Sequence, residues 1–335
     1  MTAGNDSKWY EDAIIIDGLN ASKNLPKVYE LMRAGGLTAV HVTHCSPYMR
    51  LTDTMKSMAQ WKRWFRDYAD SVVQIYSVAD IHRAKQEGKL GIILGWQDAT
   101  GFDDHLFNIQ LFKELGVRIV QMTYNTANGI GTGCYDTFDA GLTDFGCEVV
   151  QEMNRVGIAV DLSHCSSKTA ADAIRVATKP VCYTHIAPLA MYDTPRNKSD
   201  EDLRRMADQG GFIGVGLHPF LLRKLNDSEL DDYIDAIEHV ANIVGEDHVG
   251  IGTDYFEGVE PAMFKQTMTR RDRYHARELP GPPIPDFLRY PSEMSSIAEL
   301  RNIVPALERR GWTEPRMRKL LGGNFLRYLG EVWVD

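Results

Sequence analysis

The sequence predicts an α/β fold in which eight parallel strands close into a barrel, the (β/α)8 or TIM-barrel architecture. Eight short apolar runs rich in valine and isoleucine recur between residues 13 and 254, and segments with helical periodicity fill the intervals. Strands that alternate with helices in this way are parallel and are joined by right-handed crossovers. The runs are apolar on both faces, as expected when helices cover the outside and side chains fill the interior. A length of 335 residues also suits one such barrel.

The expected strands and helices alternate along the chain. The strands are Ala13–Asp17, Leu37–His44, Leu90–Gln97, Val117–Asn125, Ile158–His164, Val181–His185, Phe212–His218 and Val249–Asp254. The helical segments are Leu25–Ala34, Met55–Ala69 with Val78–Gln86, His105–Leu115, Thr143–Arg155, Ser167–Val176, Asp200–Gln209 and Leu230–Val244. Two helix-end signals agree with these bounds. Ser199 with Asp202 three residues on predicts an N-terminal cap, and Gly157 predicts a left-handed C-terminal cap.

We expect one domain over residues 1–335, because no linker, internal repeat or low-complexity tract interrupts the pattern. The stretch 260–290 is irregular and rich in proline. Beyond it, Ser292–Arg309 and Pro315–Leu329 have helical patterns and are expected to close the domain over residues 292–329.

Composition narrows the class of protein. A net charge of −9, with both signs mixed along the chain, argues against a nucleic-acid partner. No run approaches the roughly 18–20 apolar residues of a membrane span, and the N-terminus has no apolar signal core. The five cysteines are odd in number and lack a CxxC pair, which fits reduced thiols. We therefore expect a cytoplasmic protein with no membrane or nucleic-acid partner.

A parallel barrel would bring the ends of all eight runs onto one rim, where barrel enzymes hold their active sites. Most of these ends carry residues able to do chemistry, namely His44, Gln97, Asp98, Tyr124, His164, His185, His218 and Asp254. The first run is the exception. It leads into Gly18-Leu19-Asn20-Ala21, which offers almost nothing to a metal ion or a proton.

Two histidines on consecutive strands give the strongest signal of a site. His164 and His185 each close an apolar strand, and neutral imidazoles from adjacent strands can reach one zinc ion. Each histidine alone would also suit a structural hydrogen bond at a strand end. Asp254 follows two glycines that open space beside it, so its carboxylate can act as a general base. A helix-capping role is the competing interpretation of Asp254.

Three further groups are candidates for substrate contacts. Arg196 lies in the segment after His185, and its planar guanidinium can bind both oxygens of a carboxylate, although a surface salt bridge would also explain it. Tyr124 and Asn125 end the fourth run and can supply a donor to an oxyanion. His44 lies near the rim and is a candidate for the pocket lining.

With these residues assembled, the chain resembles the membrane (renal) dipeptidase family, peptidase family M19, within the amidohydrolase-like metal-dependent hydrolases. The resemblance extends over nearly the whole chain. It is most specific in Asn125-Thr126-Ala127-Asn128 through Ala140-Gly141-Leu142-Thr143, Asp161-Leu162-Ser163-His164, Thr184-His185, Thr194-Pro195-Arg196-Asn197, Gly250–Asp254 and Leu321-Gly322-Gly323-Asn324. It implies an α/β barrel that carries two zinc ions, hydrolyses dipeptides with a free carboxylate, and forms a homodimer.

The resemblance also implies roles for single residues. His164 and His185 match the histidines of the second zinc, and Arg196 matches the arginine that holds the substrate carboxylate. Asp254 matches the acid/base aspartate. Tyr124 falls where the family has a histidine that polarises the scissile carbonyl.

The chain departs from the family at the first metal. The family motif Asp-Gly-His-Asn-Asp appears here with Leu19 and Ala21 in place of its histidine and second aspartate, and Gln97 replaces the bridging glutamate. Leucine and alanine cannot ligate, and a neutral amide is a poor bridge between two dications. We therefore expect at most one zinc or other divalent ion, or none. Such an ion would be held by His164 and His185, with Gln97, Asp98 or His44 completing the shell.

Three functions remain open from the sequence. The first is a dipeptidase-like hydrolase with an altered metal centre, acting on a small carboxylate-bearing amide or dipeptide-like compound. The second is a metal-free lyase, decarboxylase or isomerase that uses the same His/Asp/Arg pocket. The third is a non-catalytic binding protein that keeps the pocket and its carboxylate clamp.

Overall fold

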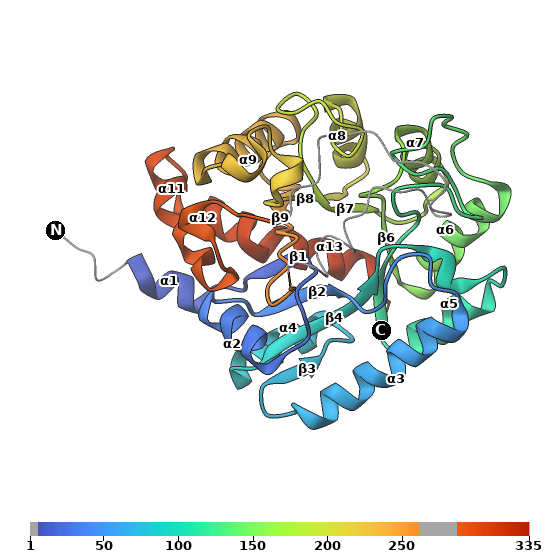
Figure 1. Ribbon diagram of the computed structural model, residues 1–335, viewed down its shortest axis with the longest axis horizontal. Helices are drawn as coiled ribbons and strands as arrows, with labels where there is room; N and C mark the ends of the chain where they lie inside the picture. Colours follow the sequence, from blue (N-terminus) through green and yellow to red (C-terminus); the bar gives the residue numbers. More distant parts are fainter. Residues whose placement is uncertain (1–5, 261–286, 335) are drawn as a thin grey trace.

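The computed structural model describes residues 6–260 and 287–334 and contains one parallel sheet of nine strands. Eight of them follow one another around a barrel (Figure 1). They are β1 (Ile16–Asn20), β2 (Ala39–Thr43), β4 (Leu90–Trp96), β5 (Val117–Gln121), β6 (Ala159–Asp161), β7 (Cys182–Ile186), β8 (Phe212–Val215) and β9 (Val249–Ile251). The ninth, β3 (Val72–Gln74), pairs with the first residues of β4 outside this path. The predicted (β/α)8 barrel is confirmed.

Backbone hydrogen bonds close the barrel. They join the residues that follow β9 to the end of β1 and the residues after it. The amide of Asp254 donates to the carbonyl of Leu19 at 2.9 Å, and that of Ala21 donates to Tyr255 at 2.9 Å. The amide of Lys23 continues the ladder by donating to Glu257 at 2.9 Å. The carboxyl end of the barrel is therefore joined through a ladder that runs past the strands themselves.

Helices surround the sheet (Figure 1). They are α1 (Asp6–Asp12), α2 (Pro26–Ala34), α3 (Leu51–Asp67), α4 (Val78–Glu87), α5 (Phe107–Glu114), α6 (Asp144–Val156), α7 (Ser167–Val176), α8 (Asp200–Asp208), α9 (Leu230–Val244), α11 (Ile303–Arg309), α12 (Glu314–Arg318) and α13 (Asn324–Val332). Both predicted helix ends are confirmed. The hydroxyl of Ser199 accepts from the Asp202 amide at 3.2 Å, and Gly157 has a φ of 80°.

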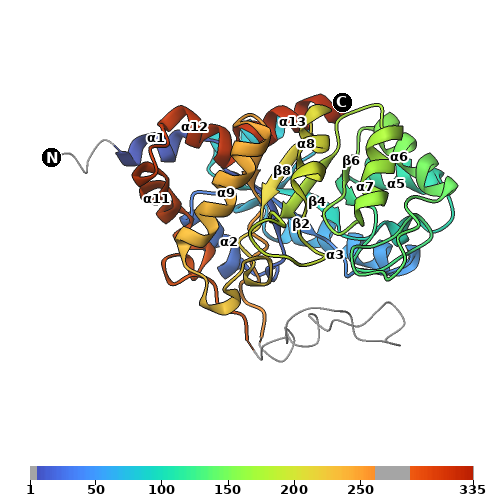
Figure 2. The same cartoon turned by 90° about the horizontal axis from the view of Figure 1, so that it is seen from above.

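The last helix, α13, covers the amino-terminal end of the barrel (Figure 2). Phe325 stacks on Phe212, the first residue of β8, with ring centroids 4.2 Å apart. The indole of Trp333 donates to the carbonyl of Arg118 at 3.2 Å. Because apolar rings fill this end, the opposite end, where the strands finish, is left to carry polar side chains.

The structure differs from several of the predicted elements, and the predicted helix Pro315–Leu329 is divided into α12, a π-helical turn (Lys319–Gly323) and α13. β1 begins at Ile16 rather than Ala13, because the Ala13 amide still donates to Trp9 at the end of α1. β3 was not predicted, since three residues show no periodicity. The predicted helix Ser292–Arg309 begins as two 3-10 segments before α11. Most of the proline-rich stretch 260–290 lies outside the described residues. Within the described part of the chain, no helix has both the length and the apolar character needed to cross a bilayer.

Candidate active site

Two imidazoles meet at the centre of the carboxyl end. His185 lies in β7 and His164 three residues after β6, and their Nε2 atoms are 3.0 Å apart. Their Nδ1 atoms are also bonded, that of His185 to the Thr184 hydroxyl at 2.8 Å and that of His164 to Asn125 Oδ1 at 2.8 Å. Each ring is thus oriented through its Nδ1 atom, and the two Nε2 atoms face each other.

The carboxylate of Asp161, the last residue of β6, anchors this pair from below. It accepts hydrogen bonds from the Thr184 hydroxyl at 2.6 Å, the Thr184 amide at 3.1 Å and the Ser163 amide at 3.0 Å. Thr184 therefore links Asp161 to His185, so a buried carboxylate positions the imidazole through one hydroxyl.

Tyr124 packs on one of the two histidines. Its ring stacks on that of His164, with centroids 4.4 Å apart and planes inclined by 21°. Burial raises the pKa of the Tyr124 phenol above its usual range, and the nearby Asp254 carboxylate adds to the effect. The phenol therefore keeps its proton at neutral pH and remains a hydrogen-bond donor.

Arg196 is buried against the ends of two strands. Its guanidinium donates to the carbonyl oxygens of Ser163 at 2.6 Å and His185 at 2.7 Å. Burial lowers the pKa values of His164 and His185 well below their usual range, and the positive charge of Arg196 lowers them further. Both imidazoles are therefore neutral at pH 7. Two donors of the guanidinium are used by the backbone, which leaves the rest for a ligand.

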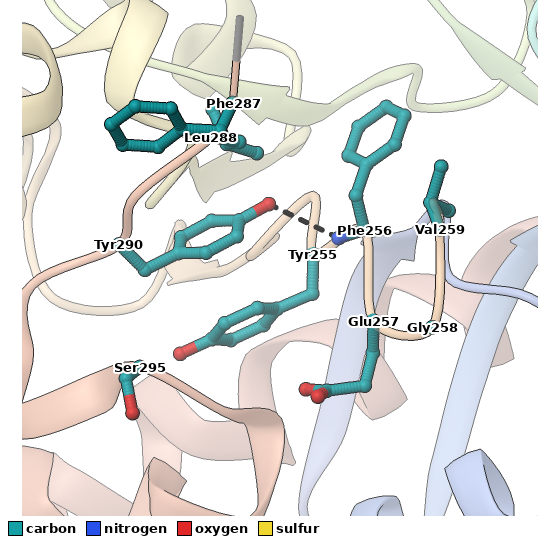
Figure 3. Close-up of a pocket in the computed structure, with 9 residues that line it drawn as sticks. All are labelled: Tyr255, Phe256, Glu257, Gly258, Val259, Phe287, Leu288, Tyr290 and Ser295. Atoms are coloured by element: carbon teal, nitrogen blue, oxygen red, sulfur yellow. Dashed lines mark hydrogen bonds between the residues drawn. The ribbon is translucent and has the colours of Figure 1, made fainter. Parts of the chain in front are cut away.

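Asp254 sits three residues past β9 in an unusual conformation. Its φ is 53°, in the left-handed region that residues other than glycine seldom adopt. Three contacts hold it there. The Asp254 amide donates to Leu19, the Tyr290 hydroxyl donates to the Asp254 carbonyl at 2.8 Å, and Asp17 accepts from the Thr253 amide at 2.7 Å. Figure 3 shows the same Tyr290 hydroxyl directed at the Phe256 amide, from which it accepts at 3.1 Å.

The carboxylate of Asp254 is poised between its two protonation states. Its Oδ1 atom is buried and has no hydrogen-bond partner in the described structure. Desolvation raises the pKa of Asp254 to about 7. The positive charge of Arg196 lowers this pKa, and the negative charge of Asp17 raises it. A carboxylate with this pKa can take and return a proton near neutral pH.

The structure brings together six of the predicted site residues, which are His164, His185, Tyr124, Asn125, Arg196 and Asp254. For the other three predicted residues the structure shows different contacts. Asp98 caps a 3-10 turn by accepting from the Thr100 amide at 2.8 Å, and it also accepts from Asn128 at 3.1 Å. The ring of His44 packs edge-on against Trp96 at 4.8 Å, and burial lowers its pKa to about 3. Gln97 is buried, and its carbonyl accepts from Gln121 at 2.6 Å.

Sequence reasoning did not assign roles to three buried residues around the site, Asp17, Lys198 and Tyr290, and it named His218 only as one of the rim residues able to do chemistry. Asp17 opens the first-strand motif, and this place in the motif was the available signal. Lys198 follows Arg196 by two residues and donates to the Cys165 carbonyl at 2.5 Å. Tyr290 comes from the far side of the proline-rich stretch, where no periodicity points to the rim.

The fold and the clustered polar groups define the class of protein, an α/β-barrel enzyme with its site at the carboxyl end of the strands. Comparisons with known proteins then give the family. The model of the membrane dipeptidase family, peptidase family M19, matches residues 5–271. The chain belongs to this family, and the predicted assignment to M19-type hydrolases is confirmed.

Three relatives illustrate the similarity. A crystal structure of an amidohydrolase from Pseudomonas aeruginosa superposes with a TM-score of 0.93 at 43% identity, covering 98% of this chain and 99% of that one. An uncharacterized protein in the pqqA 5′ region of Klebsiella pneumoniae is 29% identical over 267 residues, which is 77% of this chain and 88% of the relative. Dipeptidase tcpJ of Claviceps purpurea is 28% identical over 287 residues, which is 84% of this chain but 60% of that protein.

Membership in the family implies a divalent metal ion, and the side chains present at its ligand positions show whether they fit such an ion. The side chain of Leu19 is fully buried in β1, and Ala21 offers a methyl group, so neither can bind an ion. Across residues 6–260 and 287–334, no three His, Cys, Asp or Glu side chains gather into a metal-binding group. His164 and His185 supply two nitrogens where a catalytic zinc takes three protein ligands. The residues present do not fit the two-metal centre of the family.

Proposed function

We propose that this protein hydrolyses the amide bond of a small, carboxylate-bearing substrate of dipeptide type, with at most one metal ion at its site. The observation that supports this most is the single network in which Arg196, His185 and His164 are joined beside Asp254. The similarity to dipeptidases and other hydrolases favours hydrolysis over the lyase-type and non-catalytic alternatives.

Arg196 is proposed to bind the substrate carboxylate. Its two bonds to backbone carbonyls hold the guanidinium plane fixed, so the remaining donors are pre-organised for a bidentate contact. A carboxylate would also offset the positive charge that Arg196 places next to two neutral histidines.

Asp254 is proposed to act first as base and then as acid. It removes a proton from water, the resulting hydroxide attacks the amide carbon, and a tetrahedral oxyanion forms. When the carbon–nitrogen bond breaks, the same carboxyl group returns its proton to the leaving amine. Its pKa of about 7 suits both transfers near neutral pH.

Tyr124 is proposed to donate a hydrogen bond to the oxyanion. Its phenol stays protonated, and the stack on His164 holds the ring in place. Because His164 is itself bonded to Asn125 and His185, the donor rests on a rigid support.

The experiment compares free dipeptides with the same dipeptides amidated at the C-terminus, in wild type and Arg196→Lys. We expect hydrolysis of the free acids only, and a loss of about 10- to 100-fold in kcat/KM in the variant, because lysine cannot form the planar fork. Arg175→Lys on the exposed face of α7 is the matched control and should behave as wild type. Equal hydrolysis of amidated and free dipeptides would rule out the proposed clamp.

A further inference from the structure

An open cleft of about 460 Å³ lies at the carboxyl end of the barrel, next to the residues described above. Five of its lining side chains are apolar, namely Ala21, Leu25, Trp64, Phe256 and Val259. Lys23 is the charged residue among the side chains that line it. Clefts that bind small ligands have volumes of about 300–1,000 Å³ and mostly apolar walls, so both size and chemistry suit a ligand group.

The cleft is built on the same backbone ladder that carries Asp254. The Leu19 carbonyl accepts from the Asp254 amide, and the next bonds of the ladder join Ala21 to Tyr255 and Lys23 to Glu257. The wall of the cleft therefore begins directly after the proposed catalytic carboxylate. It belongs to the rigid closure of the barrel rather than to a separate surface.

Phe256 connects the cleft to the polar centre. Its side chain lines the cleft, and its ring contacts that of His218 edge to face with centroids 5.6 Å apart. His218 is buried, and the charge of Arg196, together with burial, lowers its pKa to about 3. One aromatic ring thus separates the apolar cleft from the cationic side of the site.

The opposite wall is also pre-formed. Trp64 packs edge to face on Trp61 at 5.1 Å, and Trp61 is buried and donates from its indole to the His44 carbonyl at 3.3 Å. At the mouth, Leu25 is 44% exposed although it is a large apolar residue. A ligand that covered Leu25 and Trp64 would gain the free energy of removing this apolar surface from water.

We propose that this cleft is the subsite for an apolar or aromatic side chain on the amino-terminal residue of the substrate. The proposal rests on the proposed function, which puts the carboxylate at Arg196. Arg196 is bonded to the ends of β6 and β7, whereas the cleft lies where β9 meets β1, and Phe256, which lines the cleft, follows Asp254 by two residues. The residue that carries the carboxylate therefore occupies the Arg196 side, and the other residue extends past Asp254 into the cleft.

Leu25 is the large apolar residue at the exposed mouth of the cleft. An aspartate there would bring a charge against the apolar wall, and an apolar ligand group would have to desolvate that charge. Leu25→Asp and Trp64→Ala therefore test the cleft from its two walls. Ala69→Asp places the same charge on an exposed position after α3, and Trp64→Phe keeps an aromatic wall, so these two are the matched controls.

The experiment measures kcat/KM for Gly-Ala, Ala-Ala, Leu-Ala and Phe-Ala, together with binding of Gly-Ala and Phe-Ala by calorimetry. We expect wild type to prefer Phe-Ala over Gly-Ala by at least about 10-fold, the discrimination that one apolar pocket typically gives. Leu25→Asp and Trp64→Ala should lower kcat/KM for Leu-Ala and Phe-Ala by about 10-fold and leave Gly-Ala within about 2-fold. Both controls should match wild type.

The outcomes separate this subsite from the proposed function. Hydrolysis of all four dipeptides at similar kcat/KM, or an equal loss on all of them in the cleft variants, would overturn the subsite and leave the hydrolase intact. Tighter binding of Phe-Ala that Trp64→Ala abolishes, without turnover of any dipeptide, would support the subsite and overturn the hydrolase. Absence of any preference in both binding and turnover would overturn the subsite as well.

Discussion

Asp254 combines a conformation that few side chains tolerate with a protonation state that few carboxylates have at neutral pH. A left-handed φ on a residue other than glycine costs of order 1 kcal/mol and persists where its surroundings hold it. Here Tyr290, Leu19 and Thr253 provide those contacts. Backbone strain of this kind is concentrated at functional sites, which agrees with the proposed role of Asp254 as base.

The pH dependence of hydrolysis tests this role. A base must be deprotonated to act, so kcat/KM should rise with pH and reach half its plateau near the Asp254 pKa of about 7. Asp17 carries a buried negative charge that raises this pKa. Asp17→Asn removes the charge and should move the midpoint to lower pH. A pH–rate profile measured on both proteins checks the shift, and an unchanged midpoint in Asp17→Asn would argue against Asp254 as the base.

At this scale the sequence predicted which side chains gather at the rim better than how they are held. Four of the predicted residues end strands or follow them: His164, His185, Arg196 and Asp254. Because the strands of a barrel are parallel, these residues lie at the same rim. The contact of Tyr290 with Asp254 spans 36 positions in the chain, and no local pattern encodes such a pairing. Whether each residue has its proposed catalytic role stays a prediction.

Among the elements, the backbone just past β9 lies so close to β7 that it leaves no room for an added methyl group. A Cβ on Gly252, just past β9, would lie 1.9 Å from the carbonyl oxygen of Thr184, which is backbone and cannot rotate away. Thr184 in turn links Asp161 to His185, so any displacement of this carbonyl reaches the site.

Gly252→Ala should therefore lower the free energy of unfolding by about 3 kcal/mol, the upper range for overpacking a filled interior. Gly330→Ala in α13 is the matched control, because its Cβ would meet nothing closer than Val78 at 3.8 Å. Replacing a helical glycine by alanine should leave stability unchanged or raise it by up to about 1 kcal/mol. Urea unfolding of the three proteins measures both effects, and equal stabilities would refute the close contact.

The strand order could be predicted because a mostly apolar run recurs at each strand, and a barrel buries such runs on both faces. The bounds of β1 could not, since the apolar residues before Ile16 belong equally to the end of α1 and to the entrance of the barrel. Strands as short as β3 and the 3-10 turns before α11 depend on tertiary contacts rather than on periodicity. Local pattern therefore gave the order of the elements, and packing set their ends.

For the molecule as a whole, the family fold is kept, and the resemblance of the sequence to the family puts Leu19, Ala21 and Gln97 at three ligand positions of its metal centre. A ligand that binds only the folded state raises stability by mass action, so zinc should raise the unfolding temperature of a protein with a complete site and leave one without it unchanged. We therefore expect protein purified without chelator to hold at most one equivalent of zinc, with no rise in unfolding temperature on addition of the second. Metal analysis and thermal unfolding with and without zinc measure this.

The variant that combines Leu19→His, Ala21→Asp and Gln97→Glu tests the opposite change, in which the three side chains that can bind metal are put back. Without metal it should be less stable than wild type, because Leu19 is fully buried in β1 and a histidine there leaves a polar ring without a partner. Zinc should restore that stability, since the new ligands complete a site around His164 and His185. Two equivalents of zinc in the wild-type protein would contradict this account, because side chains of leucine and alanine would then lie where ligands are required.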